Sequence, residues 1–238
     1  MLFRKAVLII HGFAGGTYDI EDLSNYLQLN RNFDVFTFTL PGHDKSLGKA
    51  KCEDWITKSE DEIKWLINNG YNKIYLIGHS MGGVIATYLA SKYKEVKKLV
   101  LGAPAFHYFN IEDNTIDISE TIKSIPKLVN NYGKDELISR FLKLNITTLK
   151  EFMSLVKTYY DYPKQIKCPV LILQGKSDDI VPISSSKYVY NSVKSNIKKL
   201  VFIDNETHDL FKGENKEETY KIIEEFLIKN VEGGIIND

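Results

Sequence analysis

The chain has 238 residues, which suits one domain with a large hydrophobic core and room for an insertion. Lys and Arg total 31, as do Asp and Glu, so the formal net charge is zero. A balanced charge argues against nucleic acid or an anionic membrane as the partner, because both require a basic surface. The only cysteines, Cys52 and Cys168, lie far apart with no CxxC pattern, which argues against a metal site and against a disulfide framework.

The N-terminus "MLFRKAVLII" places Arg4 and Lys5 before an apolar stretch, as a signal peptide does. The stretch "AVLII" is, however, too short for a secretory apolar region, and no run in the chain approaches transmembrane length. We therefore expect a reduced, cytoplasmic, soluble protein without stable membrane insertion, present as a monomer or a weak homodimer.

Short apolar runs predict strands at 5–10, 33–40, 73–78, 97–102, 169–174 and 198–203. Most of these runs are continuous rather than alternating, as in strands buried on both faces of a parallel sheet. Segments with helical spacing lie between and after them, at 18–28, 52–70, 81–93, 184–193 and 215–230. In the last segment Asn215 and Glu218 stand at capping-box spacing. Strands that alternate with helices predict a mostly parallel α/β sheet.

One stretch interrupts this alternation. From about Ala105 to Gln165 the chain has no strong strand pattern but several helical ones, such as "KDELISRFLKLN" and "TLKEFMSLVKTYY". The pattern predicts a core formed by 1–104 and 166–238, with a helical insertion at 105–165. Its aromatic and aliphatic side chains either line an apolar pocket or pack the insertion onto the core: Phe106, Tyr108, Phe109, Phe141, Leu142, Phe152, Leu155, Tyr159 and Tyr160.

The pattern G-x-S-x-G occurs at Gly78-His79-Ser80-Met81-Gly82, after a predicted strand and at the start of a predicted helix. A tight strand-to-helix turn there would lift the Ser80 hydroxyl clear of the sheet, and the two glycines would let backbones approach closely. The helix N-terminus adds a positive dipole and the N–H of Met81, which suit a developing oxyanion. The alternative is a chance turn rich in Gly and Ser.

A serine hydroxyl needs a base to act as a nucleophile, and the chain has five histidines. Only His208, in "FIDNETHDLF", follows both a late strand and a candidate acid, in the chain order Ser, Asp, His. His79 is adjacent to Ser80 and is expected to point away from it. The remaining three follow the first strand, follow the second strand, or begin the insertion: His11, His43 and His107. By elimination His208 is the predicted base; the alternative is a histidine in a surface loop.

Two loops complete the candidate site. "HGFAGG", residues 11–16, follows the first strand and can aim the N–H of Phe13 at the same point as that of Met81. It lacks the endings of a P-loop and the spacing of GxGxxG, the phosphate-binding alternatives. "GKSDDIVP", residues 175–182, sets Asp178 and Asp179 side by side after a strand. From the residues alone, either aspartate orients the histidine or both are turn residues.

The segments "HGFAGG", "LPGHD", "GHSMGG", "GKSDDIVP" and "ETHDLF" resemble, in order and rough spacing, the α/β-hydrolase superfamily. More narrowly, the chain is similar to small bacterial carboxylesterases and monoacylglycerol lipases with a short helical cap, and the resemblance covers nearly the whole chain. It implies an α/β-hydrolase fold, a sheet flanked by helices, with the insertion as the cap. The chain starts almost directly at the strand before "HGF", so six or seven strands are expected rather than eight.

The resemblance also implies a triad of Ser80, Asp178 and His208, since the family spacing G-x-x-D-x-x-V-P selects Asp178 over Asp179. It implies an oxyanion hole from the N–H groups of Phe13 and Met81, with no metal and no cofactor. The implied reaction is hydrolysis of short- to medium-chain carboxylic esters or monoacylglycerols through an acyl-enzyme. The alternatives are a thioesterase, an acyltransferase or a C–C hydrolase on the same triad, and a non-catalytic ligand-binding protein on the same fold.

Overall fold

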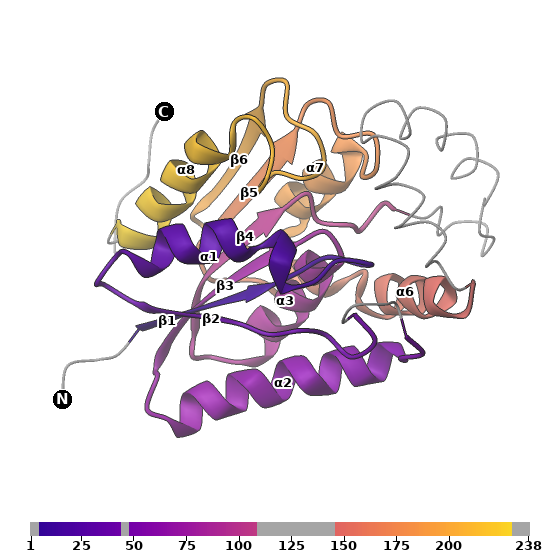
Figure 1. The fold of residues 1–238 in the computed structure, drawn as a ribbon, viewed down its shortest axis with the longest axis horizontal. Coiled ribbons are helices and arrows are strands. Elements are labelled where there is room, and N and C mark those ends of the chain that lie inside the picture. Colours follow the sequence, from indigo (N-terminus) through magenta and orange to yellow (C-terminus); the bar gives the residue numbers. More distant parts are fainter. Residues whose placement is uncertain (1–4, 44–47, 109–145, 230–238) are drawn as a thin grey trace.

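The apolar runs of the sequence form one parallel sheet. The computed structural model describes residues 5–43, 48–108 and 146–229, and in these residues six strands lie side by side in the order β2-β1-β3-β4-β5-β6 (Figure 1). Their bounds are Lys5–Ile10 (β1), Asp34–Thr37 (β2), Lys73–His79 (β3), Val96–Gly102 (β4), Val170–Gly175 (β5) and Lys198–Ile203 (β6). The predicted parallel α/β sheet of six or seven strands is confirmed.

Helices cover both faces of the sheet because successive strand residues point to opposite faces. The helices are α1 (Glu21–Gln28), α2 (Cys52–Asn68), α3 (Met81–Lys92), α6 (Ile146–Tyr159), α7 (Ile183–Ser192) and α8 (Lys216–Ile228), with short 3-10 turns η1 (Thr17–Asp19) and η2 (Tyr162–Gln165). Ala6, Leu8 and Ile10 pack into the core beneath α2, α3 and α7, whereas Val7 and Ile9 pack into the core beneath α1 and α8. No helix in the described part of the chain is both long enough and apolar enough to cross a membrane.

The two outer strands are shorter or less buried than their sequences predict. The run at 33–40 forms a strand only over Asp34–Thr37, and its residues are half-buried or exposed. The run at 198–203 forms β6, but Ile203 alone is fully buried. Both strands lie at edges of the sheet, where one side has no neighbouring strand. Burial on both faces was expected for most of the runs, and these two are the exceptions.

The start of α8 also differs from the sequence prediction. Asn215 is the N-cap residue, but its side chain makes no capping hydrogen bond to the helix. Instead its side-chain amide donates to the carbonyl of Asp204, and its backbone N–H donates to the buried carboxylate of Glu206 (2.9 Å). The predicted capping box is therefore wrong, because a carboxylate from the preceding loop takes its place at the helix N-terminus.

The predicted insertion at 105–165 lies partly outside the described residues, since 109–145 are not described. Of its described part, α6 packs against α2 and α3. Phe106, Phe152 and Leu155 are fully buried, so these three side chains pack the segment onto the core. The predicted pocket residues Phe109, Phe141 and Leu142 fall outside the described residues.

A buried lysine holds the end of α8 against the sheet. Lys98 of β4 is buried, and its ammonium donates to the carbonyls of Phe226 (2.7 Å), Leu227 (2.8 Å) and Lys229 (2.6 Å). The last carbonyls of a helix accept no hydrogen bond from within the helix, so a cation there supplies the missing donors. Its positive charge also interacts favourably with the negative end of the helix dipole. The single side chain thus joins β4 to the C-terminus of α8.

Replacing Lys98 by Met should lower the free energy of unfolding by about 2–4 kcal/mol, because buried carbonyls lose their charged donor. Urea unfolding measures the change. The matched control is Lys97→Met, since Lys97 is exposed and its ammonium donates to the nearby carbonyl of Lys94. The control should change stability by less than about 0.5 kcal/mol. Equal losses in both variants would contradict the role given to Lys98.

Candidate active site

The loops that carry the candidate site residues all follow strands. In a parallel sheet the carboxyl ends of the strands lie at one edge, which is where ligands bind in open α/β sheets. The "HGFAGG" loop follows β1, Ser80 follows β3, Asp178 follows β5 and His208 follows β6. The predicted site residues therefore share the same edge of the sheet.

The turn at Ser80 is sharp and strained. Ser80 has φ of 54° and ψ of −117°, a conformation that non-glycine residues rarely adopt. A Cβ atom at Gly78 would lie 2.4 Å from the carbonyl oxygen of Gly82, and one at Gly82 would lie 2.3 Å from the carbonyl oxygen of Ile10. Both positions therefore exclude a side chain, which is the close approach expected from the G-x-S-x-G pattern.

The "HGFAGG" loop lies directly against this turn. A Cβ atom at Gly12 would lie 3.2 Å from the Cβ atom of Ser80. His11 holds the loop: its Nδ1–H donates to the carbonyl of Gly12 (2.8 Å), and its Nε2 accepts the N–H of Leu40 (3.0 Å). Since a carbonyl only accepts and an amide N–H only donates, these partners identify the neutral tautomer with the proton on Nδ1. The loop next to Ser80 is thus fixed by a buried histidine.

The candidate acid and base are in contact. His208 Nδ1 lies 2.9 Å from Asp178 Oδ2, and both side chains are almost completely buried. Burial by itself would raise the pKa of the Asp178 carboxyl, but the charge and hydrogen bond of His208 and the N–H groups of Val181 and Ile180 outweigh it and leave that pKa below its ordinary value. The other candidate, Asp179, is half-exposed.

His79 links the serine turn to the histidine loop. Its Nε2–H donates to the backbone carbonyl of His208 (2.9 Å), and the two imidazole rings lie 4.9 Å apart. Burial, followed by the nearby His208, lowers the pKa of His79, so it is neutral at ordinary pH. The sequence interpretation placed His79 only as pointing away from Ser80 and missed this contact.

Gln174, the last side chain of the apolar run "PVLILQ", was also missed. Its Nε2 donates to Asp178 Oδ2 (2.7 Å), the oxygen that His208 contacts. A signal was present, because a polar residue at the end of a buried apolar strand must find hydrogen-bond partners. The sequence does not say which partner it finds.

Aromatic rings surround the "HGFAGG" loop. The ring of Phe13 stacks on Phe152 of α6, with centroids 4.9 Å apart and 21° between the planes. Phe152 in turn contacts Tyr108, with centroids 5.2 Å apart. Trp55 and His43 approach the edge of Phe13. The Nδ1 of His43 lies 3.1 Å from the carbonyl of Pro41, so this histidine is bonded within its own loop.

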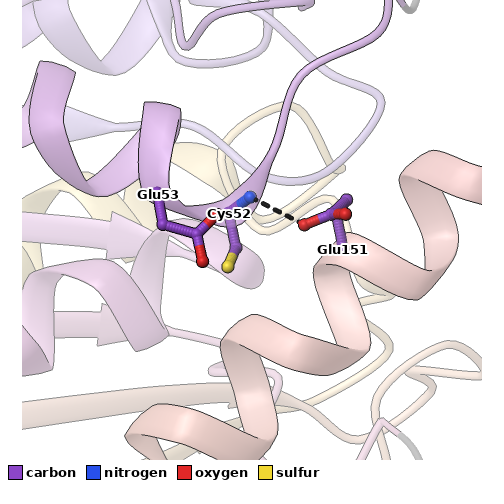
Figure 2. A group of neighbouring side chains, drawn as sticks. All are labelled: Cys52, Glu53 and Glu151. Atoms are coloured by element: carbon purple, nitrogen blue, oxygen red, sulfur yellow. Dashed lines mark hydrogen bonds between the residues drawn. The ribbon is translucent and has the colours of Figure 1, made fainter.

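A second group of polar side chains has spacing that suits a metal ion. Cys52 and Glu53 of α2 and Glu151 of α6 bring one ligand atom each within 4.8 Å of one another (Figure 2). Glu151 Oε2, however, accepts the backbone N–H of Cys52 (3.1 Å), the first residue of α2. Burial, together with a hydrogen bond to Glu53, raises the pKa of the Cys52 thiol to about 11, so the thiol keeps its proton at neutral pH. We interpret Glu151 as an anion at a helix N-terminus that joins α6 to α2.

Two family models match parts of the chain. Residues 5–159 match the family described as the alpha/beta hydrolase fold. Residues 110–216 match the family described as serine aminopeptidase, S33.

Individual relatives extend over most of the chain. A carboxylesterase of Bacillus subtilis (strain 168) is 25% identical over 230 residues, which cover 94% of this chain and 93% of that protein. A thermostable monoacylglycerol lipase of Bacillus sp. (strain H-257) is 24% identical, covering 85% of this chain and 82% of that protein. Among solved structures, a monoacylglycerol lipase of Paleococcus ferrophilus has a TM-score of 0.69 at 23% identity, with 93% of each chain covered.

The buried histidines make the stability of the fold depend on pH. Burial lowers the pKa of His11, of His79 and of His43, the last to about 4. The unfolded chain protonates these side chains near their ordinary pKa of about 6.5, so below that pH it binds more protons than the folded chain. The free energy of unfolding should therefore fall as the pH decreases from about 6.5 to about 5.5.

Urea unfolding at about pH 7.5 and about pH 5.5 measures this loss, in a window above the titration of most carboxylates. The variant His43→Gln should lose less stability between the two pH values than the wild type, because one of the protonating groups is gone. An identical loss in both proteins would show that His43 does not contribute.

Proposed function

The chain belongs to the α/β hydrolase fold family, and we propose that it is a serine hydrolase that cleaves short- to medium-chain carboxylic esters or monoacylglycerols. The observation that carries the proposal is the buried pair of His208 and Asp178, 2.9 Å apart, whose histidine is bonded through its backbone to the turn that bears Ser80. The names of the relatives, carboxylesterase and monoacylglycerol lipase, support the ester class.

In the proposed mechanism Ser80 is the nucleophile. His208 directs Nδ1–H at Asp178, so Nε2 is the basic nitrogen that removes the proton of the Ser80 hydroxyl as its oxygen attacks the ester carbonyl. The N–H groups of Phe13 and Met81 stabilise the oxyanion. His208 then protonates the departing alcohol, and a water molecule, activated in the same way, hydrolyses the acyl-enzyme and releases the carboxylic acid.

Apolar surroundings support an acyl substrate. In the proposal Phe13 has two roles: its N–H belongs to the oxyanion hole, and its ring packs with Phe152 of the insertion. The insertion at 105–165 then acts as a cap that supplies apolar side chains next to the reacting carbonyl. Small-molecule sites are mostly apolar with few polar groups, which suits short or medium acyl chains.

A thioesterase or an acyltransferase would use the same triad, since the leaving group and acceptor are selected outside it. A series of p-nitrophenyl esters of increasing chain length, assayed beside acyl-CoA thioesters, separates these activities. We expect ester hydrolysis to be faster for short and medium chains. If every ester is hydrolysed negligibly while the thioesters are turned over rapidly, the protein is a thioesterase and the proposed ester substrates are wrong.

Replacing Ser80 by Ala should reduce kcat on p-nitrophenyl butyrate by at least about 10³-fold, because the nucleophile is removed. The fold should persist, since Ala at this position meets no more strain than Ser. Circular dichroism and urea unfolding check the fold. The matched control is Ser91→Ala near the end of α3, the helix that follows Ser80; the Ser91 hydroxyl donates to the carbonyl of Tyr88. Activity close to wild type in Ser80→Ala would refute the mechanism.

The two adjacent aspartates provide a sharp internal comparison. Asp178→Asn should reduce kcat by about 10⁴-fold, because the amide no longer stabilises the imidazolium and permits the wrong tautomer of His208. Asp179→Asn should change kcat less than about threefold, since Asp179 is half-exposed and Asp178 is the one bonded to His208. If Asp179→Asn is the inactive variant, the assignment of the acid is wrong.

A further inference from the structure

The end of β5 carries a buried amide with a complete set of hydrogen bonds. Gln174 is fully buried, and its Nε2 donates to Asp178 Oδ2 (2.7 Å) and to the carbonyl of Val181 (3.3 Å). Its Oε1 accepts the hydroxyl of Ser186 (2.7 Å), which lies in α7. Both amide hydrogens and the amide oxygen therefore have partners.

These partners determine the orientation of the amide. Carboxylate and carbonyl oxygens only accept, so Nε2 must face Asp178 and Val181. A flipped amide would direct Oε1 at two acceptor oxygens inside a buried environment, which is strongly unfavourable. Ser186 supports the same orientation, because its hydroxyl donates to Oε1.

Asp178 is consequently held from four directions. Its Oδ1 accepts the N–H groups of Ile180 (2.9 Å) and Val181 (2.8 Å), and its Oδ2 accepts from Gln174 and from His208. Rotation of the carboxylate would break several of these bonds at once. Gln174 is the side-chain donor that shares the oxygen contacted by His208.

We infer that Gln174 is a positioning residue for the reaction: it holds Asp178 Oδ2 in place for His208 and, by donating to the same oxygen, limits the negative charge presented to the imidazole. This inference rests on the proposed function, because it gives Asp178 and His208 their catalytic roles. A donor on a carboxylate oxygen withdraws charge from it, so the donor weakens the attraction between that oxygen and an imidazolium.

The test is Gln174→Met, which keeps the length of the side chain and removes both donors. Without them Oδ2 presents more negative charge to His208, so protonated His208 is favoured. The acid limb of the pH profile of kcat/KM on p-nitrophenyl butyrate should move up by about half a pH unit. On the plateau kcat should fall about tenfold, which corresponds to about 1.4 kcal/mol, while KM changes less than about twofold.

Other titratable groups around His208 and its contacts are unchanged in this variant. Asp178 and His79 contact His208 directly, and Asp209 and Glu206 lie in its own loop. Asp19 of η1 acts on His79, and Tyr108, whose pKa is raised by burial and then by Asp178, lies on the side of Asp178. A shift of the acid limb in Gln174→Met is therefore caused by the loss of the amide. A role limited to packing would lower stability and leave the limb in place.

Ser186→Ala is the second variant, because it removes the support of Oε1 without touching Asp178. It should move the acid limb in the same direction by a smaller amount, and it decides the question if Gln174→Met does not fold. If the acid limb of the kcat/KM profile stays at the wild-type pH in the variant that folds, and Ser80→Ala is inactive, the inference is wrong. An active Ser80→Ala would instead overturn the proposed function, so the two failures are distinguishable.

Discussion

The backbone at Ser80 joins three strands and one helix, and the rest of the site depends on it. The N–H of Ser80 donates to the carbonyl of Gly102 at the end of β4, and its carbonyl accepts the N–H groups of Gly83 in α3 and Ala105 after β4. The N-terminus of α3 also approaches the end of β1 so closely that only glycine fits at position 82. These contacts hold Ser80 in a left-handed conformation that its own residue type disfavours. The strain is located at the proposed nucleophile, a residue that is itself almost completely buried.

A similarly close backbone approach at a glycine occurs after β5. A Cβ atom at Gly175, the last residue of β5, would lie 2.3 Å from the carbonyl oxygen of Glu206 and 2.4 Å from that of Thr207. The N–H of Ser177 donates to the carbonyl of Glu206 (2.9 Å). The loop with Asp178 and the loop with His208 thus touch through backbone atoms as well as through their side chains. Because β5 and β6 are neighbours in the sheet, the proposed acid and base approach one another without any long connection.

The strands, helices and glycine turns were predictable because they depend on local patterns. Continuous apolar runs predicted the parallel sheet, and G-x-S-x-G predicted the turn at Ser80. The edge positions of β2 and β6 were not predictable from those runs, since strand order is set by pairing between distant segments. The capping box at Asn215 failed for a similar reason: the competing carboxylate of Glu206 arrives through the fold of its loop.

Contacts between side chains distant in sequence were the hardest part of the candidate site to predict. A buried polar residue requires partners, but which partner it meets depends on how loops converge. His79 bonds to a carbonyl 129 positions later in the chain, and no pattern around "GHSMGG" indicates that contact. Gln174 lies only four positions before Asp178, yet its amide also bonds to Ser186 in the following helix. The residue types were informative, whereas their pairing required the structure.

Adjacent residues of α6 contact two different parts of the core. Glu151 of α6 caps the N-terminus of α2, and the next residue, Phe152, stacks on Phe13 beside Ser80. A change in the sequence of α6 therefore acts on two parts of the core, the position of α2 and the loop of the proposed oxyanion hole. On its other side that loop is held by His11, whose ring bonds to the carbonyl of Gly12 and to the N–H of Leu40. The loop is therefore held from two sides, by the buried imidazole of His11 and by the ring of Phe152.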